Sequence, residues 1–189
     1  MIDTVLTFLK SHLNEQFSRY SANLESAEDK AVFADTAADG SITFKEGAVN
    51  VVMINMEEDR TVRPPEPFRS RGEDGATRRI HPEIPMNLYV LFAARFAEYE
   101  QSLVYLSRVI HHFQAHRVIT PQNAPTLAPS IGKLTMELHT MTMQQQNDMW
   151  SMLKVGYQPS ALYRVKMVVF RDEDPREVPV IEQIERKIA

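Results

Sequence analysis

Two segments of this chain are apolar on both of the faces that a β-strand presents. Residues 48–56 read AVNVVMINM, and residues 87–94 read NLYVLFAA. Successive side chains of a strand point to opposite faces of its sheet, so a strand that is apolar on both faces must be covered from both sides. The two segments therefore predict the centre of a sheet against which other elements pack.

Helical periodicity supplies elements that would cover this sheet. Residues 2–20 carry apolar side chains at spacings of three and four, which predicts an opening helix with one apolar stripe. The same spacing over residues 96–113 predicts a second helix, whose core-facing stripe is Phe96, Tyr99, Leu103, Leu106, Ile110 and Phe113. Thr142 with Gln145 three residues later fits a capping box, so a short helix is expected to begin there and to end at Gly156.

Shorter strands complete the predicted architecture. Apolar pieces between turn residues in residues 31–48 predict a hairpin. Residues 131–138 alternate between apolar and polar side chains, as in a strand with one face in water. Residues 161–170 alternate again and place Arg164 and Lys166 together on one face, as a basic stripe. The predicted fold class is α+β, with a central, mainly antiparallel sheet flanked by helices.

One domain accounts for most of the chain, and we expect it to span residues 1–170. A chain of 189 residues is long enough to bury a core without metal or disulfide support. Residues 60–83, rich in Pro, Gly and Arg, are not a domain boundary, because the half before them lacks a self-sufficient core. Long inserts without regular structure usually serve an interaction or are disordered. The candidate partner-binding residues of this insert are Arg60, Arg63, Arg69, Arg71, Arg78 and Arg79.

Residues 171–189 are expected to form a polar linker followed by an apolar docking arm. The candidate partner-binding residues of the arm are Val178, Val180, Ile181, Ile184 and Ile188. An apolar segment beyond a polar linker does not stay free in water. Two possibilities are open: the arm adds a strand to a neighbour's sheet edge, or it docks on its own subunit as a short helix.

The composition excludes several classes of function. The chain has no cysteine, which excludes disulfides, thiolate nucleophiles and metal sites with sulfur ligands. A formal net charge of −4 disfavours nucleic acid as a partner. No apolar run approaches the ~20 residues that span a bilayer, and polar residues near the N-terminus interrupt any signal-peptide core. We expect a protein assembled in the cytoplasm, without direct membrane insertion.

His112 and His116 are the most enzyme-like pair in the chain. At spacing i, i+4 they share one face of a helix, where they can hold a metal. The residues between them supply no glutamate base, so the His-Glu-x-x-His pattern is absent, and nothing nearby in the sequence supplies a third ligand. Ordinary polar flanking residues are one interpretation. A metal-dependent hydrolase that uses this pair with an acidic residue near Glu57 is the alternative.

Five strings in order give the chain a family resemblance. They are INMEEDR (54–60), NLYVLFAA (87–94), YLSRVIHHFQ (105–114), QQQNDMW (144–150) and PSALYRVKMVVF (159–170). Together they resemble the cap, or tail-terminator, proteins of extracellular contractile injection systems of the virulence-cassette and antifeeding-prophage type, the Pvc16-type N-terminal domain family. The resemblance runs from the first helix to about Phe170.

This resemblance implies a structural part of a phage-tail-like particle, without catalytic residues, cofactor or metal. Such proteins are expected to form a ring, here a homo-hexamer, at the tail end opposite the baseplate. The ring binds the last layers of inner tube and sheath, ends their polymerisation and joins them. The protein is then extracellular if the particle is released, and the contacts of longer family members beyond the resembling region are expected to be missing. The remaining alternative is a monomeric adaptor for cargo or membrane anchoring, which predicts no ring.

Overall fold

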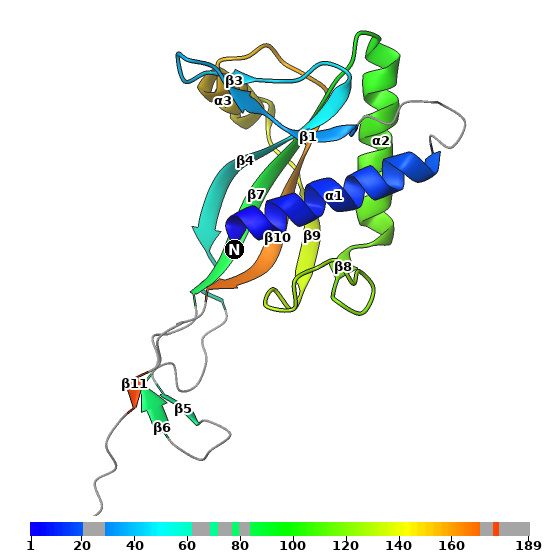
Figure 1. Cartoon of the computed structure of the whole chain (residues 1–189). Coiled ribbons are helices and arrows are strands. Elements are labelled where there is room, and N and C mark those ends of the chain that lie inside the picture. The colour runs from blue at the N-terminus through cyan, green and yellow to red at the C-terminus, as the bar shows by residue number, and fades with distance from the viewer. Residues whose placement is uncertain (21–28, 62–68, 72–76, 80–83, 171–175, 178–189) are drawn as a thin grey trace, which may run out of the picture. The chain divides into compact units, whose positions relative to one another are not determined.

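The computed structural model describes residues 1–20, 29–61, 69–71, 77–79, 84–170 and 176–177, and Figure 1 shows its helices and strands. The chain divides into two compact units. The larger unit comprises Met1–Glu57 and Met86–Val168, and the smaller comprises Glu58–Pro85 and Val169–Ala189. No helix in the described ranges is both long and apolar enough to span a bilayer. The α+β fold class is confirmed.

A six-stranded sheet forms the centre of the larger unit. Its strands in spatial order are β1 (Ala31–Phe33), β4 (Ala48–Glu58), β7 (Ile84–Arg95), β10 (Ser160–Phe170), β9 (Leu134–His139) and β8 (Val118–Ile119). β1 runs parallel to β4, whereas β9 is antiparallel to both β10 and β8. The start of β4 bonds to the end of β7, since the Gly47 N–H donates to the Arg95 carbonyl at 2.7 Å. The predicted, mainly antiparallel sheet is therefore correct.

The two central segments differ in how completely they are covered. Residues 87–94 of β7 are buried without interruption, as predicted from their two apolar faces. In β4 only residues 48–51 are fully buried, and both Met53 and Met56 are exposed. The prediction of two-sided cover over residues 48–56 was wrong for the second half: Val52 and Ile54 pack only partly buried against the cluster around Trp150, whereas Met53, which points to the other face, and Met56 are exposed.

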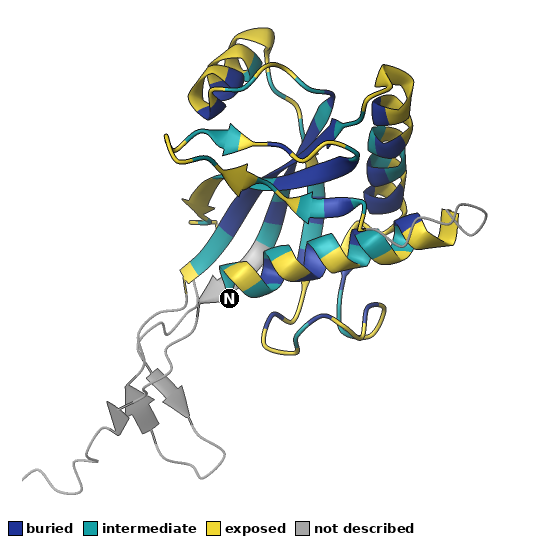
Figure 2. Ribbon diagram, turned by 45° about the horizontal axis from the view of Figure 1, so that its top comes forward, coloured by how far each residue is buried: buried dark blue, intermediate teal, exposed yellow. Residues whose placement is uncertain are grey.

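Helices α1 (Ile2–Tyr20) and α2 (Tyr99–Ala115) cover one face of the sheet, which we call the helix-pair face. α1 buries Val5, Phe8, Leu9, Leu13 and Phe17, so most of its predicted apolar stripe faces the core, although Tyr20 at its end is exposed. The ring of Phe17 meets that of Tyr105 on α2, with centroids 5.1 Å apart. Phe113 of α2 in turn contacts Phe92 of the sheet at 5.4 Å. Figure 2 shows the buried side of α1 turned toward the sheet.

The buried face of α2 consists of residues other than those predicted. The buried residues are Ser102, Tyr105, Val109, His112 and Phe113. Phe96 precedes the helix and stacks on Tyr105, with ring centroids 4.5 Å apart. The Ser102 hydroxyl accepts a hydrogen bond from the Phe96 N–H, so a polar residue takes the core-facing position at this end. As a consequence Leu103, which the periodicity placed in the core, lies on the surface.

Helix α3 (Met143–Leu153) covers part of the opposite face, which we call the α3 face. The predicted capping box is present: Thr142 Oγ1 accepts from the Gln145 N–H, and Gln145 Oε1 accepts from the Thr142 N–H. The helix ends at Lys154, which has a left-handed φ of 56°, and not at Gly156 as predicted. Trp150 packs edge-on against Phe44, next to Leu91 and Leu162 of the sheet.

Small elements complete the structure. β2 (Asp35–Thr36) and β3 (Ile42–Thr43) form the predicted hairpin. β9 begins at Leu134, three residues later than expected, because residues 128–133 form turns around Gly132, whose φ is 70°. In the smaller unit, β5 (Arg69–Arg71), β6 (Thr77–Arg79) and β11 (Arg176–Glu177) form a sheet in the order β11-β6-β5. The insert therefore contains regular structure, and the single domain over residues 1–170 with a separate arm over 171–189 stays a prediction.

Candidate interaction surfaces

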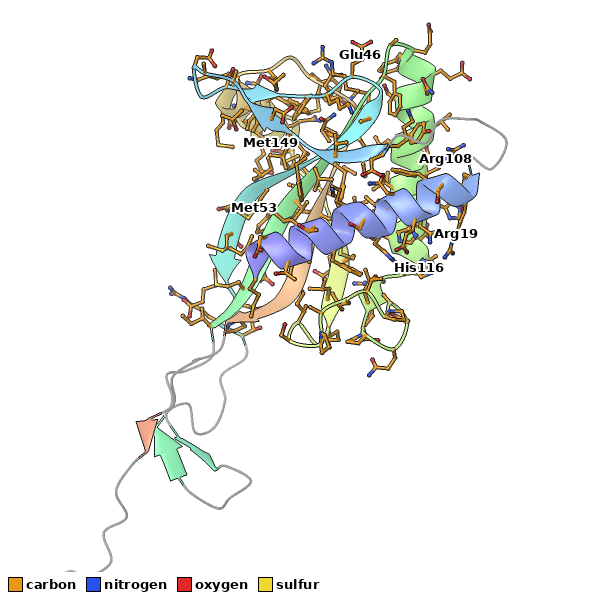
Figure 3. All side chains as sticks on the ribbon, viewed as in Figure 1. Arg19, Glu46, Met53, Arg108, His116 and Met149 are labelled. Carbon is orange, nitrogen blue, oxygen red and sulfur yellow. The ribbon has the colours of Figure 1, made fainter. Side chains whose placement is uncertain are left out.

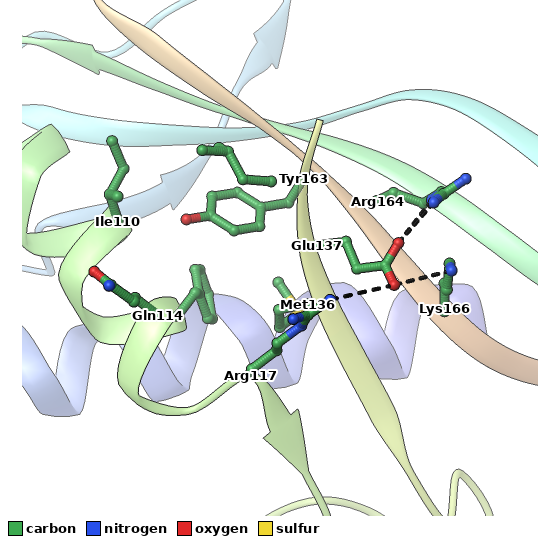
Figure 4. A pocket seen from close by; sticks show the side chains of 10 residues that line it. Ile110, Gln114, Arg117, Met136, Glu137, Tyr163, Arg164 and Lys166 are labelled. Carbon is green, nitrogen blue, oxygen red and sulfur yellow. Dashed lines mark hydrogen bonds and ion pairs between the residues drawn. The ribbon is translucent and has the colours of Figure 1, made fainter. Parts of the chain in front are cut away.

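A cationic groove lies between the C-terminal half of α2 and strands β9 and β10 (Figure 4). Its volume is about 640 Å³, and it is lined by Ile110, Phe113, Gln114, Arg117, Met136, Glu137, Leu138, Tyr163, Arg164 and Lys166. Strand β10 supplies the predicted basic stripe, Arg164 and Lys166. The β9–β10 register places Arg164 directly opposite Glu137, so the strand pairing itself builds this charged cluster.

Glu137 is the centre of the charged cluster in the cationic groove. Its carboxylate lies 2.6 Å from Arg164 Nη2, 2.9 Å from Lys166 Nζ and 3.8 Å from Arg117 Nη2. The hydrogen bonds from Lys166 and Arg164 lower the pKa of Glu137, and the bond to Glu137 raises the pKa of Arg164. Three cations thus surround one carboxylate, so the groove keeps an excess of positive charge.

The inner wall of the cationic groove is apolar. Tyr163 is buried against Phe113, with ring centroids 5.1 Å apart, and burial raises the pKa of Tyr163 to about 12. Tyr163 is therefore neutral at physiological pH. Leu138 at the rim is 54% exposed. An apolar wall beside a cationic rim suits contact with a protein surface that carries both apolar and acidic side chains.

The arginines of the insert lie in the smaller unit. Arg60 pairs with Glu58 at 3.2 Å, but the pair is exposed and contributes little to stability. Arg63 lies outside the described residues, as do Val178, Val180, Ile181, Ile184 and Ile188 of the arm. Arg71 and Arg78 stand opposite Thr77 and Ser70 in the β5–β6 register. Arg79 stands opposite Arg69 on one side and Arg176 on the other, so the backbone aligns three arginine positions across this sheet.

Three histidines meet where α1 crosses α2. The ring of His12 on α1 lies 4.8 Å from that of His112, and the ring of His116 lies 4.6 Å from that of His112. Figure 3 marks His116 at the end of α2 near Arg19 of α1. Local patterns could not identify His12 as a neighbour of His112, because the two residues are 100 positions apart along the chain.

This histidine cluster does not form a metal site. The rings of His112 and His116 are stacked, 26° from parallel, and His116 Nδ1 lies 3.1 Å from the backbone carbonyl oxygen of His112. In the described ranges, no group of three or more His, Asp or Glu side chains is arranged to hold a metal ion. The hydrolase alternative requires an acidic residue near Glu57. Glu57 itself accepts a hydrogen bond from the Tyr89 hydroxyl at 2.8 Å. The hydrolase hypothesis gains no support from this geometry.

Burial makes His112 a neutral packing element of the histidine cluster. It lowers the pKa of His112 to about 4, and the nearby His12, His116 and Arg19 lower it further than burial alone. Burial likewise lowers the pKa of His12, against the opposing effect of Glu15. The Nε2 atom of His112 is buried and has no hydrogen-bond partner in the described structure. Since nothing there stabilises a second proton, His112 is neutral at physiological pH.

A second groove, on α3, was not identified from the sequence. Its volume is about 650 Å³, and it is lined by Met143, Gln146, Asn147, Trp150, Ser151, Lys154, Val155 and Tyr157. Met143 is 82% exposed at its edge. The signal available in the sequence was the run of methionines around Trp150, which suits either core filling or an adaptable surface. The structure assigns Met149 to the core and Met143 to the surface.

Comparison with known proteins relates this fold to others. A family model described as the Pvc16 N-terminal domain matches residues 4–183. The chain is similar to the PVC sheath/tube terminator in the extended state, from a cryo-EM structure of an extracellular contractile injection system. The TM-score is 0.65 at 17% identity, covering 100% of this chain and 64% of that one. It is also similar to the anti-feeding prophage cap, a tube-terminating cap, with a TM-score of 0.55 at 15% identity.

The second of these similarities covers 94% of this chain and 60% of the cap. The chain thus spans less than two thirds of the length of either structural relative. At these identities the likeness concerns the fold. No curated protein matches the chain.

Proposed function

Because the chain belongs to the Pvc16 N-terminal domain family, we propose that it is a structural terminator of a contractile injection particle. In this role it forms a ring on the last layers of inner tube and sheath, ends their polymerisation and joins the two. The observation that carries the proposal is the family match, which extends over residues 4–183. The fold shared with a sheath/tube terminator over the whole of this chain supports it. The role requires no catalytic group, cofactor or metal.

The sheet edges of the larger unit suit a part that ends a polymer. A long open edge is a template for adding further strands. Here the two outermost strands are short, since β1 has three residues and β8 has two. A terminator must adhere on one side and refuse further addition on the other. The short edge strands disfavour further addition, and the two grooves offer surfaces for adhesion.

The arginines of the smaller unit are the proposed contacts with tube or sheath. Like charges at opposed strand positions weaken pairing. A small sheet with arginine at Arg69, Arg79 and Arg176 is therefore stabilised by an acidic partner surface. The pairing of β11 with β6 holds the start of the arm in its own subunit. From there we propose that residues 178–189 reach the neighbouring sheath by strand addition.

Six copies in the ring would match a sixfold tube and sheath, and the protein would be assembled in the cytoplasm and leave the cell with the particle. The test is negative-stain imaging of particles assembled with and without the protein, recording tail length and the end opposite the baseplate. Capped tails of uniform length with it, and ragged or overlong tails without it, are expected. Unchanged tails would contradict the proposal.

A truncation after Glu177 separates the two parts of this role. We expect tails assembled with the truncated protein to be of uniform length but to lose the link between tube and sheath at the capped end. The control is Ser18→Ala, at an exposed position near the end of α1 that belongs to none of the proposed contact surfaces, and it is expected to leave particles unchanged. Normal tube-to-sheath attachment without residues 178–189 would exclude the arm as the link.

A further inference from the structure

The N-terminal half of α2 carries an exposed surface that is both acidic and apolar. We call it the acidic patch; it consists of Glu98, Tyr99, Glu100, Leu103 and Val104. Leu103 and Val104 are each 42% exposed, one turn beyond Tyr99 and Glu100. In the part of the chain that the structure describes, neither glutamate forms an ion pair. Carboxylates near a helix N-terminus stabilise the helix, which accounts for the glutamates but not for the apolar residues beside them.

The cationic groove lies at the other end of the same helix. Its rim carries Arg117, Arg164 and Lys166 around the single carboxylate of Glu137, and Leu138 is exposed beside them. The groove therefore has an excess of positive charge next to an apolar surface. The acidic patch has the opposite charge, also next to an apolar surface. The two surfaces are complementary in both respects.

One subunit cannot bring these two surfaces together. α2 has 17 residues, so its ends are about 25 Å apart along a rigid rod. Two different, complementary surfaces on one chain can meet only between copies, in a head-to-tail contact. Such a contact closes into a ring when its rotation allows, whereas a symmetric contact between identical patches yields a dimer.

We propose that the acidic patch of one subunit docks in the cationic groove of the next, and that this contact closes the terminator ring. The inference rests on the proposed ring and names the surfaces that would build it. Leu103 and Val104 pack against Leu138 and the apolar wall of the groove, and Glu98 and Glu100 face its cations. The apolar contact supplies affinity, and the charges set the orientation of neighbouring subunits.

The cysteine-free sequence permits a direct crosslinking test. The double variant Leu103→Cys/Leu138→Cys, treated with a short bis-maleimide in purified particles and as purified protein at high concentration, is expected to give a ladder of covalent oligomers. Mixing the two single variants should give dimers and nothing larger, because each copy then carries one reactive side. The control Leu138→Cys/Met143→Cys should give no ladder, since Met143 lies on α3.

Charge reversal tests the recognition itself. Glu98→Lys/Glu100→Lys and Arg117→Glu are each expected to reduce the yield of crosslinked oligomer at least about tenfold in the Leu103→Cys/Leu138→Cys background. Combining the reversals in one chain should restore it. Circular dichroism of each variant should match that of the parent, since all three positions are exposed.

The result that overturns this inference differs from the one that overturns the proposed function. Capped tails of normal length without a 103–138 ladder would leave the terminator role intact and exclude this contact. Crosslinks from either cysteine to tube or sheath protein, and none between copies, would also exclude it. If tails are uncapped, crosslinking of the purified Leu103→Cys/Leu138→Cys protein tests the contact. A ladder of oligomers supports the head-to-tail contact, and the absence of a ladder at high protein concentration excludes it.

Discussion

The two faces of the central sheet are packed very differently. On the helix-pair face, two long helices bury side chains completely, with Leu9, Leu13, Phe92 and Val109 at 0% exposure. On the α3 face a single short helix covers a smaller cluster, and its members Trp150 and Leu153 keep some contact with solvent. We therefore expect the helix-pair face to contribute more to the stability of the larger unit than the α3 face, whose core is smaller and lies under an exposed groove.

Both faces carry candidate interaction surfaces, since the cationic groove and the acidic patch involve α2 and the second groove lies on α3. A surface that binds a partner needs exposed apolar groups, which cost stability in the free protein. The α3 face can carry such groups, like Met143, because the helix-pair face already supplies a complete core. Substitutions of comparable size on the two faces measure the difference between their cores directly, provided that the protein unfolds in one cooperative step.

The largest effect is expected for Phe92→Ala on the helix-pair face. Phe92 is fully buried between Phe113 and Tyr163, at ring distances of 5.4 and 5.8 Å. Removing its ring leaves a cavity and should reduce the free energy of unfolding by about 3–5 kcal/mol in urea titration. The control Phe33→Ala, at a 40% exposed position on edge strand β1, should cost less than about 1 kcal/mol. Equal losses would refute the contrast in burial.

A smaller loss is expected for Leu153→Ala on the α3 face. Leu153 is buried in the last turn of α3, where the chain can relax into the space left behind. The expected decrease is about 2 kcal/mol, at the low end for leucine truncation, because collapse of the site reduces the cavity. The same titration measures it. A loss as large as that for Phe92→Ala would mean that both faces contribute equally.

Acid should destabilise the helix-pair face through its histidines. The folded-state pKa of His112 is about 4, below the ordinary value of 6.5, so its contribution to stability is complete above pH 6.5 and is lost as pH falls toward 4. The groups that act on it are His12 and Arg19 on α1 and His116 on α2, while Glu15 acts on His12. Lowering the pH from 7.5 to 5 should reduce the free energy of unfolding by about 2 kcal/mol.

The check is urea unfolding of the parent and of His112→Leu at both pH values. His112→Leu lacks the titrating group and should lose clearly less stability than the parent between pH 7.5 and 5. A variant that loses as much as the parent would place the acid sensitivity elsewhere. Its stability at pH 7.5 serves as its own reference, so a packing defect in the variant does not obscure the comparison.

Local patterns predicted the elements, and tertiary contacts decided their details. The two apolar strands, the opening helix and the capping box of Thr142 were correct, because each depends on residues close together in the chain. The resemblance to terminator proteins is confirmed by the family match. For α2 the spacing identified a helix but not its buried face, since Leu103 and Val104 are apolar on the exposed side while Ser102 and His112 are buried.

The interaction surfaces were less predictable than the fold. Arg164 and Lys166 stood out as a basic stripe, but Glu137 did not, because only the pairing of β9 with β10 brings it opposite Arg164. The pairing of β11 with β6, nearly 100 residues apart, was equally invisible to local patterns. Both depend on the register between strands, which no single segment contains.

The smallest effect is expected at the cationic groove, through Glu137→Gln. The substitution removes the carboxylate that pairs with Arg164 and Lys166 and keeps the size of the side chain. The cluster is partly exposed, so the expected loss is about 1 kcal/mol, decreasing at high salt. The pKa of Glu137 is lowered in the folded state, so this contribution is present above its unfolded value and lost as pH falls below it. A loss that resembles the one for Leu153→Ala, or that is unaffected by salt, would mean that Glu137 belongs to the core of the sheet and not to an interaction surface.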